Sequence, residues 1–273
     1  MIDINALFKA TILEKLRAGE DPAQIEEDMP DLFLQWLDTP NAATGGVSPN
    51  EYFYSMDTAQ LADALCDYVS AGKNPPDPLL NALEDASDSE EPLFELLCGK
   101  RGSFSQMEQS LKAKRVAAEL LNQKGSALPV QEYLEIVKNP TQDEGLNEAA
   151  AMGLSAMGEA VQEQLLAALK GASDEAADCL LDLLSALPKK DKRVFDYLIG
   201  HFRAREERRA FFAGLLARYG DPKALPVLEQ ALPFAGYVDY CALRDAIESL
   251  GGTVSEQRDF SGDPDYEKLK QKR

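Results

Sequence analysis

The chain has 273 residues and carries 47 acidic against 28 basic side chains, a formal net charge of −19. Its apolar fraction of 45% and its charged fraction of 27% are ordinary for a globular protein, which excludes a disordered, a collagen-like or a membrane protein. The sequence contains no run of about 18 apolar residues, the length needed to cross a bilayer. Residues 1–5 show neither the positive nor the apolar part of a secretion signal. We therefore expect no membrane partner.

The cysteines indicate a reducing compartment. Cys66, Cys98, Cys179 and Cys241 stand far apart, each among apolar neighbours with helical spacing. Such a pattern forms neither a metal-ligand cluster nor a disulfide framework. The sequence therefore favours the cytoplasm and gives no reason to expect a metal.

The charge is concentrated in the first part of the chain. Residues 1–99 contain 20 acidic and four basic side chains, whereas residues 100–273 contain 27 and 24. This contrast predicts an acidic helical N-terminal region over 1–99. Its charge favours solubility, or forms an acidic docking face for a basic partner. It makes nucleic acid an unlikely ligand, because phosphate groups would be repelled.

Helix signals follow one another through the N-terminal region, and no alternating strand pattern is found. Apolar residues at helical spacing predict a first helix over residues 4–16. Proline after a capping aspartate predicts a second helix, over residues 22–37. Further starts are expected at Ser48, where Glu51 completes a capping box, at Asp57 for a helix ending at Gly72, and at Asp77 and Ser89.

A repeat of about thirty residues organises the second region, 100–252. Pairs of amphipathic helices are separated by breaks at Gly125, Gly158, Pro188, Gly220 and Gly251, with spacings of 33, 30, 32 and 31 residues. The small residues of 149–158 should let helices approach closely. One pair cannot bury its apolar face alone, so stacked pairs predict an all-α fold, an α-α superhelix. A closed helical bundle with coincidental spacing is the alternative.

The segment 220–232, Gly-Asp-Pro-Lys-Ala-Leu-Pro-Val-Leu-Glu-Gln-Ala-Leu, together with the preceding helix 211–219, resembles the short HEAT-like repeat of phycobilisome lyases and many bacterial proteins. The resemblance covers about residues 104–251. It departs from the pattern at Pro188, which stands in Leu-Pro-Lys-Lys-Asp, and at Gly158, which precedes Glu159 and Ala160. It implies an α-solenoid with a binding or scaffold role, but a fold alone does not establish a function.

A second, shorter resemblance concerns residues 36–53. A Trp-Leu-x-x-Pro-Asn segment followed by Gly-Gly-x-x-Pro is similar to a loop in the toxin-binding domains of Xre-type antitoxins. Ala43 and Thr44 replace the apolar residue expected before the glycines. The alternative is a glycine-permitted turn whose Trp36 packs into the core.

Catalytic chemistry has little support in the sequence. The only histidine, His201, lacks an identifiable nucleophile or orienting carboxylate, and interaction with a helix C-terminus explains it equally. No phosphate loop, dinucleotide-binding glycine pattern or EF-hand is found. We expect a protein that is not an enzyme and needs no cofactor.

A basic island spans residues 189–209, with eight basic and four acidic side chains. A solvated turn with local ion pairs is one explanation of this basic island. It could also contact the acidic N-terminal region or an acidic partner. Nucleic-acid binding would require a broad cationic face that a chain of charge −19 does not offer.

These patterns predict a non-enzymatic protein–protein interaction or scaffold module that binds another protein or peptide. The second helices of successive repeats should line its concave face and expose the following side chains there: Gln131, Glu132, Glu135, Gln162, Glu163, Arg193, Asp196, Tyr197, His201, Glu229 and Gln230. The alternative is a small-ligand site or enzyme in the same groove, with Tyr133, Tyr197 and His201 as contacts. The polar tail 253–273 is either disordered or draped over the last repeat as a cap.

Overall fold

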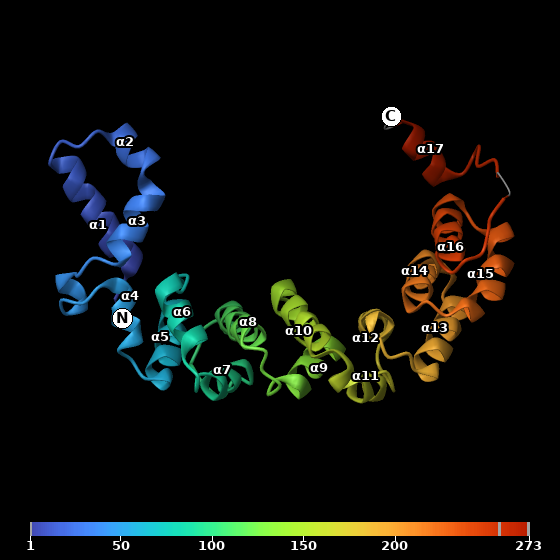
Figure 1. The fold of residues 1–273 in the computed structure, drawn as a ribbon, viewed down its shortest axis with the longest axis horizontal. Helices are drawn as coiled ribbons and strands as arrows, with labels where there is room; N and C mark the ends of the chain where they lie inside the picture. The colour runs from blue at the N-terminus through green and yellow to red at the C-terminus, as the bar shows by residue number, and fades with distance from the viewer. Residues whose placement is uncertain (1, 256–257, 272–273) are drawn as a thin grey trace. The chain divides into compact units, whose positions relative to one another are not determined.

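A computed structural model describes residues 2–255 and 258–271 of the chain. These residues form α-helices and short 3-10 helices joined by turns, with no strand among them (Figure 1). The expected all-α class is therefore confirmed. The chain divides into two compact units: unit 1 contains Met1–Ile136 and Pro140–Ala156, and unit 2 contains Val137–Asn139 and Met157–Arg273. The change in charge at residues 99–100 falls inside unit 1.

Unit 1 contains α1–α8, together with α9 up to Ile136 and α10 up to Ala156. Their bounds are α1 Ile4–Arg17, α2 Pro22–Glu27, α3 Met29–Leu37, α4 Pro49–Tyr54, α5 Thr58–Ser70, α6 Asp77–Asp85, α7 Glu90–Leu97, α8 Met107–Gln123, α9 Val130–Lys138 and α10 Glu144–Met157. Helix α8 packs against α5, α6 and α7, so the helices before and after residue 100 share one core.

Unit 2 continues the series with paired helices. Their bounds are α11 Gln162–Ala168, α12 Asp174–Ala186, α13 Lys192–Ala204, α14 Arg209–Tyr219, α15 Leu225–Ala231, α16 Tyr237–Ser249 and α17 Pro264–Gln271. Helix α14 packs against α12, α13 and α16, and α15 packs against α16. Helix α14 thus contacts both helices of the preceding pair and the first helix of the next pair.

Most helix starts lie where their capping residues predict them. Ser48 and Glu51 form a reciprocal capping box at α4, and Asp57 forms one with Gln60 at α5. The second predicted helix is instead two, α2 and α3, which meet at Asp28. Pro30 has no N–H to continue the hydrogen-bond ladder, which accounts for the interruption.

Two other starts differ in their caps. Asp77 is the first helical residue of α6 rather than its cap, and Pro76 precedes it. The Ser89 side chain makes no capping bond at α7. It is buried, and its hydroxyl donates a hydrogen bond to the Leu83 carbonyl at 2.6 Å.

The predicted repeat breaks coincide with helix ends. Gly125, Gly158, Gly220 and Gly251 all have φ between 59° and 88°, the left-handed conformation that favours glycine. At Gly220 the backbone N–H closes α14 by bonding to the Leu216 carbonyl. Asp221 then accepts from the Lys223 N–H and starts the next turn. The local geometry of these breaks follows directly from residue type.

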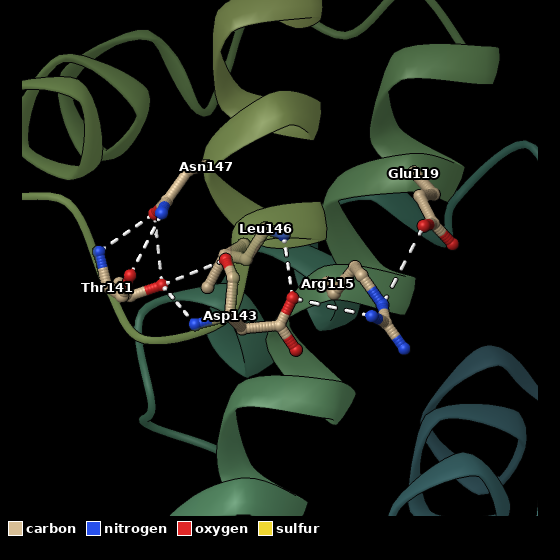
Figure 2. A network of polar contacts seen from close by, with 6 residues as sticks. All are labelled: Arg115, Glu119, Thr141, Asp143, Leu146 and Asn147. Atoms are coloured by element: carbon tan, nitrogen blue, oxygen red, sulfur yellow. Dashed lines mark hydrogen bonds and ion pairs between the residues drawn. The ribbon is translucent and has the colours of Figure 1, made fainter.

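A polar network joins the start of α10 to α8 within unit 1 (Figure 2). The Asp143 carboxylate accepts the Leu146 N–H at 2.9 Å and lies 3.4 Å from an Arg115 nitrogen of α8. Asn147 closes the preceding turn through bonds to the backbone and hydroxyl of Thr141. The cap of one helix is therefore also its attachment to another.

The described residues of the tail form a cap on the last helix pair. Helix α17 packs against α16. The ring of Phe260 lies 5.3 Å from that of Tyr237 and 5.0 Å from that of Tyr240. Asp263 accepts a hydrogen bond from the Tyr237 N–H at 3.0 Å. Of the two interpretations of the tail, the structure supports the cap; its residues 256–257 and 272–273 lie outside the described part.

Candidate functional site

Helix α13 carries one buried and one accessible face. Asp191 caps it by accepting the Arg193 N–H at 2.8 Å. Val194, Leu198 and Phe202, spaced four residues apart, are buried in unit 2. The opposite stripe consists of Arg193, Asp196, Tyr197, Gly200, His201 and Ala204. The amphipathic pattern of the helix therefore determines which side chains are available to a partner.

This accessible stripe lines an open depression of about 490 Å³. Four predicted site residues are brought together there: Arg193, Asp196, Tyr197 and His201. Gly200 leaves the middle of the stripe uncovered, since a Cβ added at that position would meet no atom within 4 Å. The surface is thus largely apolar at its centre and charged towards the start of the helix.

Packing behind the depression holds the histidine. The His201 ring stacks on Phe212 of α14, with centroids 5.5 Å apart and planes 28° apart. Phe212 is itself fully buried. His201 is half-buried, so one side of its ring is anchored while the other side faces the depression.

Two carboxylates hold Arg193 at the charged end. Its guanidinium lies 2.5 Å from Glu163 of α11 and 2.7 Å from Asp191. Hydrogen bonds from Arg193 lower the pKa of Asp191 to about 2 and also lower the pKa of Glu163. Both carboxylates therefore remain charged at neutral pH, and together they hold the Arg193 side chain in one orientation.

The Asp191 interaction predicts a specific pH dependence. Because the pKa of Asp191 falls from 3.8 to about 2 on folding, its charge stabilises the protein above pH 4, and that stabilisation is lost as the pH falls from 4 to 2. Asp191→Asn, which keeps a capping oxygen, should unfold about 1 kcal/mol more easily at pH 7. Urea unfolding of the parent and of Asp191→Asn should show that the difference in their unfolding free energies decreases below pH 4. A gap unchanged down to pH 3 would contradict the assignment.

The prediction that Gln162 is exposed on the concave face is wrong. It is only 5% exposed, and its side-chain amide donates a hydrogen bond to the Lys189 carbonyl at 3.0 Å. The residue joins the start of α11 to the turn before α13. Its neighbour Glu163 is exposed as expected and pairs with Arg193.

The remaining predicted residues lie on other helices. Gln131 and Glu135 of α9 are exposed and Glu132 is half-buried; all three belong to unit 1. Glu229 and Gln230 of α15 are exposed in unit 2. Gln230 lines a separate groove, described below.

Tyr133, a contact considered for a small ligand, is wrong for that role. It is completely buried in unit 1, and its hydroxyl lies 3.0 Å from the Ala118 carbonyl and 2.8 Å from the Asn122 side chain. Burial raises the pKa of this phenol well above its usual range. Tyr133 is therefore a core residue of the α8–α10 region.

Most charges of the basic island have local partners. Arg205 and Arg208 both contact Asp178 of α12, and Arg209 pairs with Glu206. The ion-pair interpretation therefore accounts for much of the island. Sequence reasoning missed Asp178, because nothing in its neighbourhood along the chain shows that it meets two arginines about thirty residues away.

Metal-binding clusters and membrane-spanning helices are both absent from the described residues. No group of three His, Cys, Asp or Glu side chains there is placed to hold a metal ion. Within the same part of the chain, every helix is too short or too polar to cross a membrane. Neither the models of known protein families nor the curated proteins yield a match to this chain.

Proposed function

We propose that this chain is a cytoplasmic, non-enzymatic helical-repeat protein that binds a segment of another protein across the second helices of its repeats. In this proposal the paired helices of 104–251 stack as a HEAT-like solenoid, and α13 contributes to its concave face. The contacts of α14 with α12 and α13 of the preceding pair and with α16 of the next pair support such stacking.

The observation that carries the proposal is the accessible stripe of α13. It presents an aromatic ring, an imidazole and an uncovered stretch of backbone at Gly200 within one open depression. Tyrosine and arginine are the residues that most often dominate binding energy at interfaces. Gly200 and Ala204 let a partner backbone approach closely, while Arg193 and Asp196 supply polar contacts at one end.

A small-ligand site is the second candidate, because Tyr197 and His201 do line the same depression, whose volume falls in the usual range for such sites. However, ligand sites normally enclose most of the ligand, and every lining side chain here comes from a single helix. An open surface of this kind suits an extended or helical protein segment better.

A pair of glycine variants tests the proposal. Gly200→Arg should fill the depression, whereas Gly214→Arg places the same side chain on α14, where a Cβ also meets no atom within 4 Å. Both glycines are helical and exposed, so both variants should fold at least as well as the parent. Affinity capture from the native cell should return a partner with the parent protein and Gly214→Arg, and at least tenfold less with Gly200→Arg.

Retention of every captured partner by Gly200→Arg would exclude the α13 depression as the binding site. Capture of no partner, together with turnover of a metabolite by the purified protein, would overturn the non-enzymatic assignment.

A further inference from the structure

A second groove lies between α13 and α15, two successive second helices of unit 2. Its volume is about 370 Å³. Phe202 and Arg203 line it from α13, and Val227 and Gln230 from α15. Glu206 and Arg209, from the turn and helix that follow α13, and Phe234 also line it. The groove joins part of the basic island to an apolar wall.

The cations of this groove are incompletely paired. Arg203 is exposed, and within the described part of the chain it makes no ion pair or hydrogen bond. Arg209 contacts Glu206 at 2.9 Å through one terminal nitrogen, while its buried Nε–H has no acceptor. A buried donor without an acceptor is unfavourable, because it has lost its hydrogen bonds to water. Of the two guanidinium groups only that of Arg209 has a carboxylate partner among the described residues, so the groove is locally positive in a chain of charge −19.

An exposed aromatic ring stands beside these arginines. Phe234 is 82% exposed, the highest value among the large apolar side chains of the described residues. It lies in a short 3-10 helix, Leu232–Phe234, at the end of α15. Aromatic residues and arginine are enriched at protein interfaces relative to the rest of the surface. An exposed phenylalanine beside two arginines, of which only Arg209 has a carboxylate partner in the part of the chain that the structure describes, indicates a partner with both apolar and acidic groups.

We propose that the α13–α15 groove binds an acidic, apolar segment of a partner protein, with carboxylates at Arg203 and Arg209 and a large apolar side chain against Phe234 and Val227. This inference rests on the proposed function and specifies the chemistry of the bound segment. A short acidic protein segment suits the groove better than a nucleic acid, since an extended phosphate backbone would continue past the two arginines and meet the negative charge of the rest of the chain.

A designed peptide pair tests the charge requirement. The probe is fluorescein-labelled Gly-Glu-Glu-Leu-Phe-Glu-Glu-Gly, and its control carries glutamine in place of every glutamate. Fluorescence anisotropy with the full chain should give the acidic peptide a Kd on the order of 100 μM or tighter at low salt. The glutamine peptide should bind at least tenfold more weakly. Added salt should lower the affinity for the acidic peptide only.

Variants of the groove separate binding from folding. Glu206→Gln should raise the affinity for the acidic peptide three- to tenfold, because it removes the competing carboxylate, whose side chain is 78% exposed. Arg203→Glu should lower the affinity at least tenfold, and Phe234→Ala at least fivefold. Arg17→Glu makes the same charge change on an exposed residue of α1 in unit 1 and should leave the affinity unchanged.

Failure of the acidic peptide to bind, or an affinity unchanged in Glu206→Gln and Arg203→Glu, overturns the inference. The inference is also overturned if labelled oligothymidylate binds more tightly than the peptide and Arg203→Glu abolishes that binding. The groove would then recognise phosphate. A cellular partner lost from Gly200→Arg but retained by Arg203→Glu would overturn this inference and leave the proposed function standing.

Discussion

Gly153→Ala should lower the free energy of unfolding by about 2–3 kcal/mol, through overpacking at a buried helix contact. Gly153 lies in the middle of α10, and an added Cβ would overlap Cε2 of Tyr133 and Oδ1 of Asn122. Tyr133 cannot yield without losing the contacts of its hydroxyl. Asn122 is held in turn by a 2.8 Å bond from its amide to the Ala149 carbonyl. The clash therefore has no flexible side chain to absorb it.

Gly214→Ala is the matched control for this substitution. Gly214 is also helical, but it is exposed and has open space around it. Alanine is favoured over glycine in a helix by up to about 1 kcal/mol, so this variant should be more stable than the parent. Urea unfolding followed by circular dichroism compares the three proteins. Equal stability of the two alanine variants would show that α10 does not pack against Tyr133 as described.

Trp36 allows the measurement to be assigned to one part of the chain. It is the only tryptophan, it is buried, and it belongs to unit 1, as does Gly153. If the units unfold separately, the Gly153→Ala shift should appear in the fluorescence transition of Trp36. A shift seen only by circular dichroism would place the effect outside the cooperative unit that contains Trp36.

Local chemistry predicted the helix boundaries because capping and glycine conformation depend on few neighbouring residues. Ser48 and Glu51 satisfy each other's backbone groups within a single turn, and the positive φ at Gly125 and Gly220 needs only the absence of a Cβ. The accessible stripe of α13 followed from helical periodicity in the same way.

Long-range pairing could not be predicted in this way. Gln162 appears exposed by its polarity, and only the position of the Lys189 carbonyl explains its burial. The composition of residues 149–158 indicated close helix approach but not that Gly153, among its small residues, meets Tyr133. The α13–α15 groove depends on how two helices and the segments that follow them meet, which no spacing along one helix shows.

Asp178 should prove the most costly carboxylate to remove from unit 2. It lies on α12 with 12% of its side chain exposed, and its oxygens lie 2.5 Å from Arg205 and 2.9 Å from Arg208. Asp178→Ala should cost about 3 kcal/mol of unfolding free energy, because it leaves the 85%-buried Arg205 without its principal counterion. Glu207 lies 3.5 Å from the Nε of Arg205, but its side chain is 70% exposed, so it can replace the lost carboxylate only in part.

Asp182, four residues later on the same helix, provides the matched comparison. It pairs with Arg218, but both side chains are more than 40% exposed, so Asp182→Ala should cost at most about 1 kcal/mol. Raising the salt concentration should reduce the stability loss of Asp182→Ala and leave that of Asp178→Ala nearly unchanged, because salt screens a buried ion pair poorly. Urea unfolding at two salt concentrations makes the comparison. Similar, equally salt-sensitive losses for the two variants would mean that Asp178 behaves as a surface charge and that water, not Asp178, stabilises Arg205.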